Sequence, residues 1–277
     1  MVSIMFNIFS ELSPVIQAMI AAIFTWGVTM LGAAIVFFFK EVKKSIMDAL
    51  LGFSAGVMIS ASFWSLLNPS IEMANNLNMN SWLVAFVGFL AGGLLLFIGD
   101  KVFNYFSPKS NNSNNDKLKR SLMLIFSITL HNIPEGLVIG VAFGSLAYGI
   151  EGATLASAIA LAIGIGLQNF PEGSAISLPL RRDGMSRKKA FFIGQLSGIV
   201  EPISAVIGAF LVLKIQTLLP FLLAFAAGAM IYVVVEELIP ESQSNARKDL
   251  MALFTLIGFS IMMILDVALG KNQDHFN

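Results

Sequence analysis

The sequence has no cysteine, only two histidines and few charged residues, which make up 12% of its 277 residues. Without cysteine the chain has no disulfide bond, no thiolate metal ligand and no cysteine nucleophile. A soluble domain of this length normally carries about a quarter charged residues. The formal net charge is +0, so charge gives no reason to expect a nucleic-acid partner.

Hydrophobic residues make up 56% of the chain, and the mean hydropathy is +0.80. About 20 apolar residues in a helix cross the roughly 30 Å of hydrocarbon in a bilayer. The sequence therefore predicts an all-α integral membrane protein, with residues 1–277 forming a single transmembrane domain. The eight predicted spans are 15–39, 47–67, 82–106, 122–146, 153–180, 190–213, 218–235 and 250–269.

The positions of lysine and arginine predict the orientation of these spans. Under the eight-span assignment, all of the 17 basic residues lie on one side of the membrane except Lys214 and Lys271. Cytoplasmic loops carry an excess of basic residues, so we expect a multi-pass protein of the cell membrane with both termini on the non-cytoplasmic side. Residues 107–118, rich in asparagine and serine, are predicted to form a flexible cytoplasmic loop. Residues 68–80 are predicted to form an external loop.

Two copies of one polar motif interrupt the fourth and fifth predicted spans. The sequence reads HNIPEG at 131–136 and QNFPEG at 168–173. Ionisable residues inside a membrane span are costly and mark functional sites. The proline of each copy lacks an amide hydrogen, so each helix is expected to kink and free a carbonyl beside the polar residues. Such a backbone is tolerated in a membrane where it lines a cavity or is buried in protein.

The spacing within each motif places its polar side chains on one helix face. His131 and Glu135 are four residues apart, which is about one helical turn, and Gln168 and Glu172 repeat this spacing. The asparagine of each copy lies three residues before its glutamate and borders the same face. The candidate ligands from the two motifs are His131, Asn132, Glu135, Gln168, Asn169 and Glu172.

Three carboxylates are predicted to lie at similar depths near the middle of the bilayer. At 1.5 Å per residue, Glu135, Glu172 and Glu201 lie about 22, 14 and 18 Å of helix from their basic cytoplasmic edges. Unpaired carboxylates close together at that depth are very costly as anions. A bound divalent cation compensates two or three of them at once. The sequence therefore predicts a buried cation site.

Other polar and sulfur-containing residues give weaker signals. Met58 lies near mid-depth of the second span and offers a thioether ligand, although a single methionine in an apolar helix more often serves packing. Glu236, Glu237 and Glu241 cluster at the cytoplasmic end of the seventh span. They form either a solvated helix end or an exit path that attracts cations, and composition does not distinguish the two.

Together these motifs resemble the ZIP (Zrt/Irt-like) family of metal-ion transporters, in particular its prokaryotic branch, over essentially all eight spans. Further similarity lies in GFSAGVM at 52–58, ASFWS at 61–65, Glu201-Pro202 and EELIPE at 236–241. The resemblance implies a 3+2+3 arrangement of spans with inverted pseudo-symmetry, a homodimer, and transport of zinc toward the cytoplasm, with the ion as substrate and no cofactor.

The resemblance also implies two neighbouring metal positions between spans two, four, five and six. One position uses Met58, His131, Glu135, Gln168 and Glu172. The other uses Asn132, Glu135, Asn169, Glu172 and Glu201. Many family members have histidine where this chain has Gln168. The transported ion could therefore be cadmium, iron(II) or manganese as well as zinc.

Two other functions compete with metal transport. A proton- or sodium-coupled carrier of an organic solute also uses membrane carboxylates, to bind its coupling ion. An intramembrane metalloenzyme is disfavoured, because zinc hydrolases use motifs such as His-Glu-x-x-His, which this sequence lacks. The chain is therefore predicted not to be an enzyme.

Overall fold

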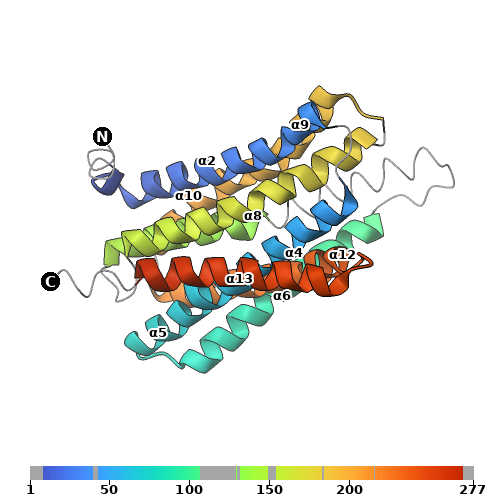
Figure 1. Cartoon of the computed structure of the whole chain (residues 1–277). Helices are drawn as coiled ribbons and strands as arrows, with labels where there is room; N and C mark the ends of the chain where they lie inside the picture. The colour runs from blue at the N-terminus through green and yellow to red at the C-terminus, as the bar shows by residue number, and fades with distance from the viewer. Residues whose placement is uncertain are drawn as a thin grey trace.

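The computed structural model describes residues 9–39, 43–106, 129, 132–148, 154–182, 184–214 and 216–270 (Figure 1). This described part is helical and contains no β-strand. Residues 132–145 form one helix, and the other elements are α2 (Pro14–Ala33), α3 (Ile35–Phe38), α4 (Lys44–Ala61), η1 (Ser62–Leu67), α5 (Asn68–Asn76), α6 (Ser81–Phe106), η2 (Leu146–Tyr148), α8 (Leu155–Arg182), α9 (Arg187–Leu196), η3 (Ser197–Ile199), α10 (Val200–Lys214), η4 (Gln216–Leu218), α11 (Leu219–Val233), η5 (Val234–Leu238), α12 (Ile239–Ser242) and α13 (Lys248–Gly270).

Six stretches of the described residues are long and apolar enough to cross a membrane. They are 14–38, 44–76, 81–102, 187–213, 219–242 and 248–268. The fifth predicted span is α8, whose 28 residues include the polar motif at 168–173. The fourth corresponds to the helix 132–145, and the first part of that predicted span lies outside the described residues, as does the predicted loop 107–118. The all-α membrane fold is confirmed.

The second span is longer than predicted. It continues from α4 through the π-helix η1 into α5, so the predicted external loop 68–80 is helical as far as Asn76. The loop prediction is wrong because asparagine, although common in loops, lies within a helix at these positions. Here Asn68 donates to Glu72 one turn later, with 2.8 Å between Nδ2 and Oε1. Such pairs four residues apart stabilise a helix surface.

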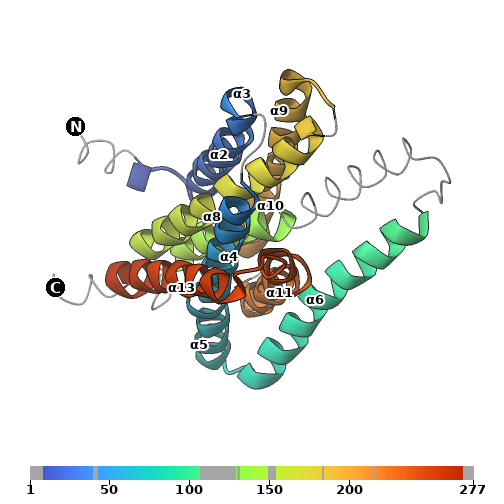
Figure 2. The same cartoon turned by 45° about the vertical axis from the view of Figure 1, so that its right-hand side comes forward.

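The long helices pack in two groups. In one, α2 packs against α8 and α10; in the other, α4 packs against α13 and α6 packs against α11 (Figures 1 and 2). The groups meet where α4 contacts α8. Helix α2 begins and α13 ends at one end of the bundle, whereas α4 begins and α8 ends at the other (Figure 1). This arrangement agrees with an even number of spans.

Close glycine contacts join the helices of the second group in matching ways. A Cβ on Gly56 of α4 would overlap the Thr255 carbonyl of α13, and a Cβ on Gly228 of α11 would overlap the Phe89 carbonyl of α6. The two contacting helices α4 and α11 also share a sequence, LLGFSAGVMI at 50–59 and LLAFAAGAMI at 222–231. A π-helix begins three residues after each copy.

Helices α4 and α11 run in opposite directions. Ser242, which follows α11, donates to Asp48 near the start of α4, and Ser70, which follows α4, donates to Pro220 at the start of α11. The repeated sequence, the repeated glycine contact and the repeated π-helix therefore occur on helices of opposite polarity. This is the inverted pseudo-symmetry expected between the outer triplets of spans. By this pseudo-symmetry the helix pair α4 and α13 corresponds to the helix pair α11 and α6.

Candidate metal site

The described polar side chains of the two motifs come from the helix 132–145 and from α8, and all of them are buried. His131 lies outside the described residues. The fully buried members are Asn132, Glu135, Gln168 and Asn169, and Glu172 is 6% exposed. Glu201, on the first turn of α10, is also fully buried. The structure therefore brings the carboxylates and amides of the predicted site into the interior of the bundle.

The glycine that ends each motif allows a neighbouring helix to approach closely. A Cβ on Gly136 would overlap the Glu201 carbonyl of α10, and a Cβ on Gly173 would overlap the Thr29 carbonyl of α2. Each glycine directly follows a motif glutamate. Glycine therefore sets the helix spacing beside Glu135 and Glu172, which fixes where their carboxylates lie.

Each amide of the second motif donates to a carboxylate. Gln168 donates from Nε2 to Glu135 Oε1 at 2.6 Å, and Asn169 donates from Nδ2 to Glu201 Oε2 at 2.9 Å. A side-chain amide has one oxygen acceptor and one NH₂ donor. Because the NH₂ groups are used in these bonds, the amide oxygens remain to act as acceptors.

Five buried oxygen atoms of the two motifs have no hydrogen-bond partner among the described residues. They are Asn132 Oδ1, Glu135 Oε2, Gln168 Oε1, Asn169 Oδ1 and Glu172 Oε2. Buried polar groups in native proteins are nearly always paired, and leaving one unpaired costs about 1–3 kcal/mol. Carboxylate and amide oxygens are ligands for divalent cations. This set of atoms, which we call the oxygen cage, suits a cation.

The three buried carboxylates are close enough to interact electrostatically. Glu135 interacts with both Glu172 and Glu201. In the described part of the chain, however, no three histidine, cysteine, aspartate or glutamate side chains form a metal-binding group. The three carboxylates therefore do not by themselves form a complete ligand set, and the other proposed ligands are needed. His131 lies outside the described residues, and three of the five cage oxygens are amide oxygens.

Met58 approaches the site from the other helix group. It is buried in α4, with 1% of its surface exposed. Ser54, one turn earlier on the same face of α4, donates to the backbone carbonyl of Gln168 at 3.2 Å. The predicted thioether ligand therefore lies on the face of α4 that contacts α8 beside the second motif.

A model of the ZIP zinc transporter family matches residues 12–121 and 116–266. The chain belongs to the ZIP family. The zinc transporter ZIP11 of Xenopus tropicalis is 37% identical, with 93% of this chain and 98% of the relative covered. The zinc transporter ZIPB of Bordetella bronchiseptica is 34% identical, covering 88% of this chain and 79% of the relative. The zinc transporter GufA of Myxococcus xanthus is 31% identical, covering 91% and 98%.

The predicted exit path of this ZIP protein lies on η5 and α12. Glu236 and Glu241 are exposed, and Glu237 is half-buried. Glu237 interacts electrostatically with Glu172 of the second motif. The acidic cluster is therefore near enough to the buried carboxylates to influence a cation there.

Two threonines of α2 contact the site and were missed in the sequence. Thr25 donates to Glu201 Oε2 at 2.5 Å, and Thr29 donates to Glu201 Oε1 at 3.5 Å. The available signal was two hydroxyl residues spaced by four in a largely apolar span. That signal is weak, because threonine hydroxyls in membrane helices often bond back to their own helix.

Two half-buried acids form hydrogen bonds away from the cage. Ser65 of η1 donates to Asp266 of α13 at 2.6 Å, and Tyr232 of α11 donates to Asp100 of α6 at 3.1 Å. Each bond joins the two helices of one pseudo-symmetric pair. In the ZIP fold of this chain these acids therefore link helices within a pair.

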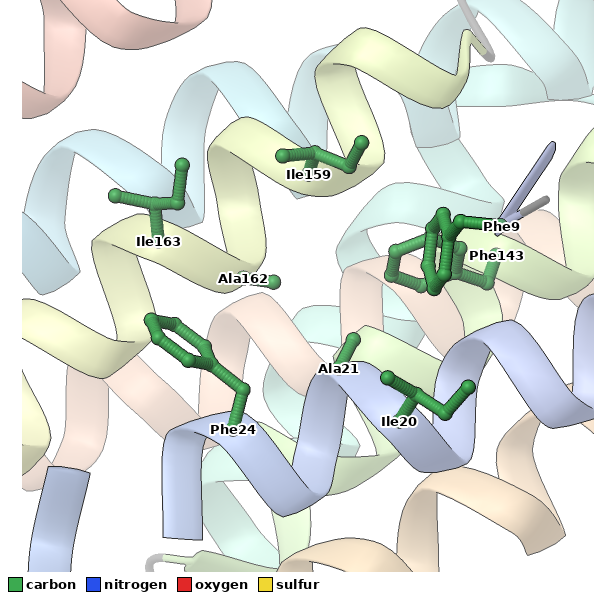
Figure 3. Close-up of a pocket in the computed structure, with 8 residues that line it drawn as sticks. All are labelled: Phe9, Ile20, Ala21, Phe24, Phe143, Ile159, Ala162 and Ile163. Carbon is green, nitrogen blue, oxygen red and sulfur yellow. The ribbon is translucent and has the colours of Figure 1, made fainter. Parts of the chain in front are cut away.

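A cavity of about 270 Å³ lies away from the oxygen cage (Figure 3). It lies between α2, the helix 132–145 and α8, and its lining is Phe9, Ile20, Ala21, Phe24, Phe143, Ile159, Ala162 and Ile163. All eight side chains are apolar, so the cavity offers no ligand to a cation. This cavity and the metal site are therefore different places.

Proposed function

We propose that this chain carries a divalent transition-metal ion, zinc first among them, across the cell membrane toward the cytoplasm. The oxygen cage carries this proposal. It offers buried carboxylate and amide oxygens whose hydrogen-bonding capacity is unused by the described residues. The proposed ligands of the transported ion are Met58, His131, Asn132, Glu135, Gln168, Asn169, Glu172 and Glu201.

The charge of the site favours a cation over a neutral solute. Glu135 and Glu172 are buried side chains within membrane spans, and isolated anions there are very costly. A doubly charged cation between them removes that cost. The related proteins ZIP11, ZIPB and GufA are named as zinc transporters, which supports zinc as the ion.

The ligand types favour a site that accepts several metals. The cage itself contains only oxygen donors, and His131 supplies the single imidazole of the proposed set. Zinc favours nitrogen and sulfur ligands, whereas oxygen donors suit manganese and related ions. We therefore expect cadmium, iron(II) and manganese to compete with zinc.

The proposed route rests on the acidic cluster, the orientation on the positions of lysine and arginine, and the assembly on the family resemblance. Glu236, Glu237 and Glu241 attract the ion as it leaves toward the basic, cytoplasmic end of the bundle. Both termini lie on the non-cytoplasmic side, and two copies form a homodimer. Accessibility of cysteines introduced at each end of the bundle, in intact cells, tests this orientation.

Uptake of radioactive zinc into proteoliposomes tests the function. The purified protein should give saturable zinc uptake that cadmium and manganese inhibit, whereas empty liposomes should not. A carrier of an organic solute would give no saturable metal flux, and that result would refute the proposal. A metalloenzyme would also lack it and would instead process a membrane substrate.

Metal binding should weaken as the pH falls. Carboxylates and histidine bind a metal in their deprotonated forms, so protons compete with the ion and binding releases protons. We expect zinc affinity, measured by isothermal titration calorimetry, to fall between about pH 8 and pH 5, where a perturbed histidine or glutamate titrates. An affinity that stays constant over this range would contradict the ligand assignment.

A further inference from the structure

Two hydroxyl groups on α2 hold the carboxylate of Glu201. Thr25 and Thr29 are fully buried and lie one helical turn apart. The Thr25 hydroxyl lies 2.5 Å from Glu201 Oε2, and the Thr29 hydroxyl lies 3.5 Å from Oε1. Thr25 therefore makes the short contact, and Thr29 makes a long one at the limit of hydrogen bonding.

Both oxygens of Glu201 are already engaged. Besides Thr25, Oε2 accepts a hydrogen bond from Asn169 Nδ2 at 2.9 Å. On the other side, a Cβ added to Gly198 would lie 3.0 Å from Oε1 and 3.2 Å from the Thr29 hydroxyl. The carboxylate thus occupies a tight space between α2 and η3, with donors from α2 and α8 around it.

This arrangement determines how Asn169 is presented. Its NH₂ group is directed to Glu201 and, at 3.4 Å, to the Thr25 carbonyl. Its oxygen Oδ1 therefore remains in the oxygen cage, with no partner in the described part of the chain. If the amide were reversed, the cage would receive a nitrogen donor, which cannot bind a cation.

We propose that Thr25 and Thr29 are positioning residues for metal binding. They fix the Glu201 carboxylate, and Glu201 in turn orients Asn169 so that its oxygen binds the ion. Glu201 is itself a ligand of the second metal position in the family pattern, so the two hydroxyls position both a ligand carboxylate and, through it, the Asn169 amide. Helix α2 has no charged side chain between Pro14 and Ala33, yet it belongs to the site through these hydroxyls. The inference rests on the proposed metal transport.

Cadmium binding to the purified full-length protein, measured by isothermal titration calorimetry, tests the inference. Thr25→Val keeps the shape and removes the hydroxyl, and we expect cadmium affinity to fall about 10-fold or more, as for other groups that orient metal ligands. Thr25→Ser restores the hydroxyl and should bring the affinity close to wild type. Thr29→Val should have a smaller effect than Thr25→Val, because its contact is longer.

Ser70→Ala is the matched control. The Ser70 hydroxyl is also fully buried and donates to the Pro220 carbonyl at 2.7 Å, in the helix group that does not carry the motifs. Its loss should leave cadmium affinity unchanged. If Thr25→Val does not fold, Thr25→Ala removes the same hydroxyl with less bulk and should show the same loss.

The outcomes separate the inference from the proposed function. A wild-type protein that binds no cadmium would refute the metal site itself. If the wild type binds and Thr25→Val binds equally well, the positioning role is wrong. The positioning role is also wrong if Thr25→Ser is as weak as Thr25→Val, or if Ser70→Ala weakens binding as much.

Discussion

Replacing Glu135 with glutamine should reduce zinc uptake into proteoliposomes on the order of 100-fold or more. Glutamine keeps the shape of the side chain and an oxygen that can accept the bond from Gln168. It replaces the unpartnered Oε2 with an NH₂ group and removes one negative charge. Removing one partner of a buried charge pair costs about 3–5 kcal/mol, which corresponds to at least a 100-fold loss of affinity.

Glu172→Gln should behave in the same way, since Glu172 also contributes a carboxylate and an unpartnered oxygen to the cage. The control is Glu72→Gln. Glu72 is an exposed carboxylate that accepts a hydrogen bond from Asn68. Its loss should leave uptake within about 2-fold of wild type, because exposed charge pairs contribute little. Uptake by Glu135→Gln at the wild-type rate would rule out the cage as the transport site.

The residues of the cage could be predicted because they are polar or ionisable and lie within apolar membrane spans. Glu135 and Glu172 are ionisable groups inside apolar spans, and such groups require a partner. The hydrogen-bond roles within the cage could not be predicted. Gln168 and Asn169 each have a donor and an acceptor, and which one faces the cage depends on carboxylates brought by tertiary packing.

The contacts of Thr25 and Thr29 could not be predicted from the sequence either. In the sequence they are two threonines of a membrane span, where a hydroxyl is expected to bond back to its own helix. In the structure each hydroxyl lies within hydrogen-bond distance both of a carbonyl of α2 and of Glu201. Their contact with Glu201 joins residues 176 and 172 positions apart. Only the packing of α2 against α10 creates that contact, and no local pattern reports it.

The apolar spans followed from hydropathy, because the apolar length needed to cross a bilayer is fixed. The π-helices η1 and η5 did not follow from it, since hydrophobic patterning does not distinguish α from π turns. The repeat of residues 50–59 at 222–231 was present in the sequence. The glycine contacts show that the repeat reflects the pseudo-symmetry, because in both copies the same glycine contacts a carbonyl of a partner helix.

These glycine contacts lead to the second large expected effect, which is on stability. Gly92→Ala should lower the free energy of unfolding by about 3 kcal/mol and the thermal midpoint by roughly 6–12 °C. A Cβ on Gly92 of α6 would overlap the Phe225 carbonyl of α11, and backbone cannot yield as a flexible side chain does. The two helices would have to separate along their contact.

Gly93→Ala is the matched control, one residue later on the same helix. Its added Cβ would lie 3.5 Å from the nearest atom, which is ordinary van der Waals contact. Both substitutions gain the same helix propensity of about 1 kcal/mol, so the difference between them isolates the close approach. Gly258→Ala, whose Cβ would overlap the Phe53 carbonyl of α4, should reproduce the loss in the other helix pair. Equal thermal midpoints for Gly92→Ala and Gly93→Ala would mean that α6 and α11 are not held at this separation. The close glycine contact would then contribute nothing to the stability of the pseudo-symmetric packing.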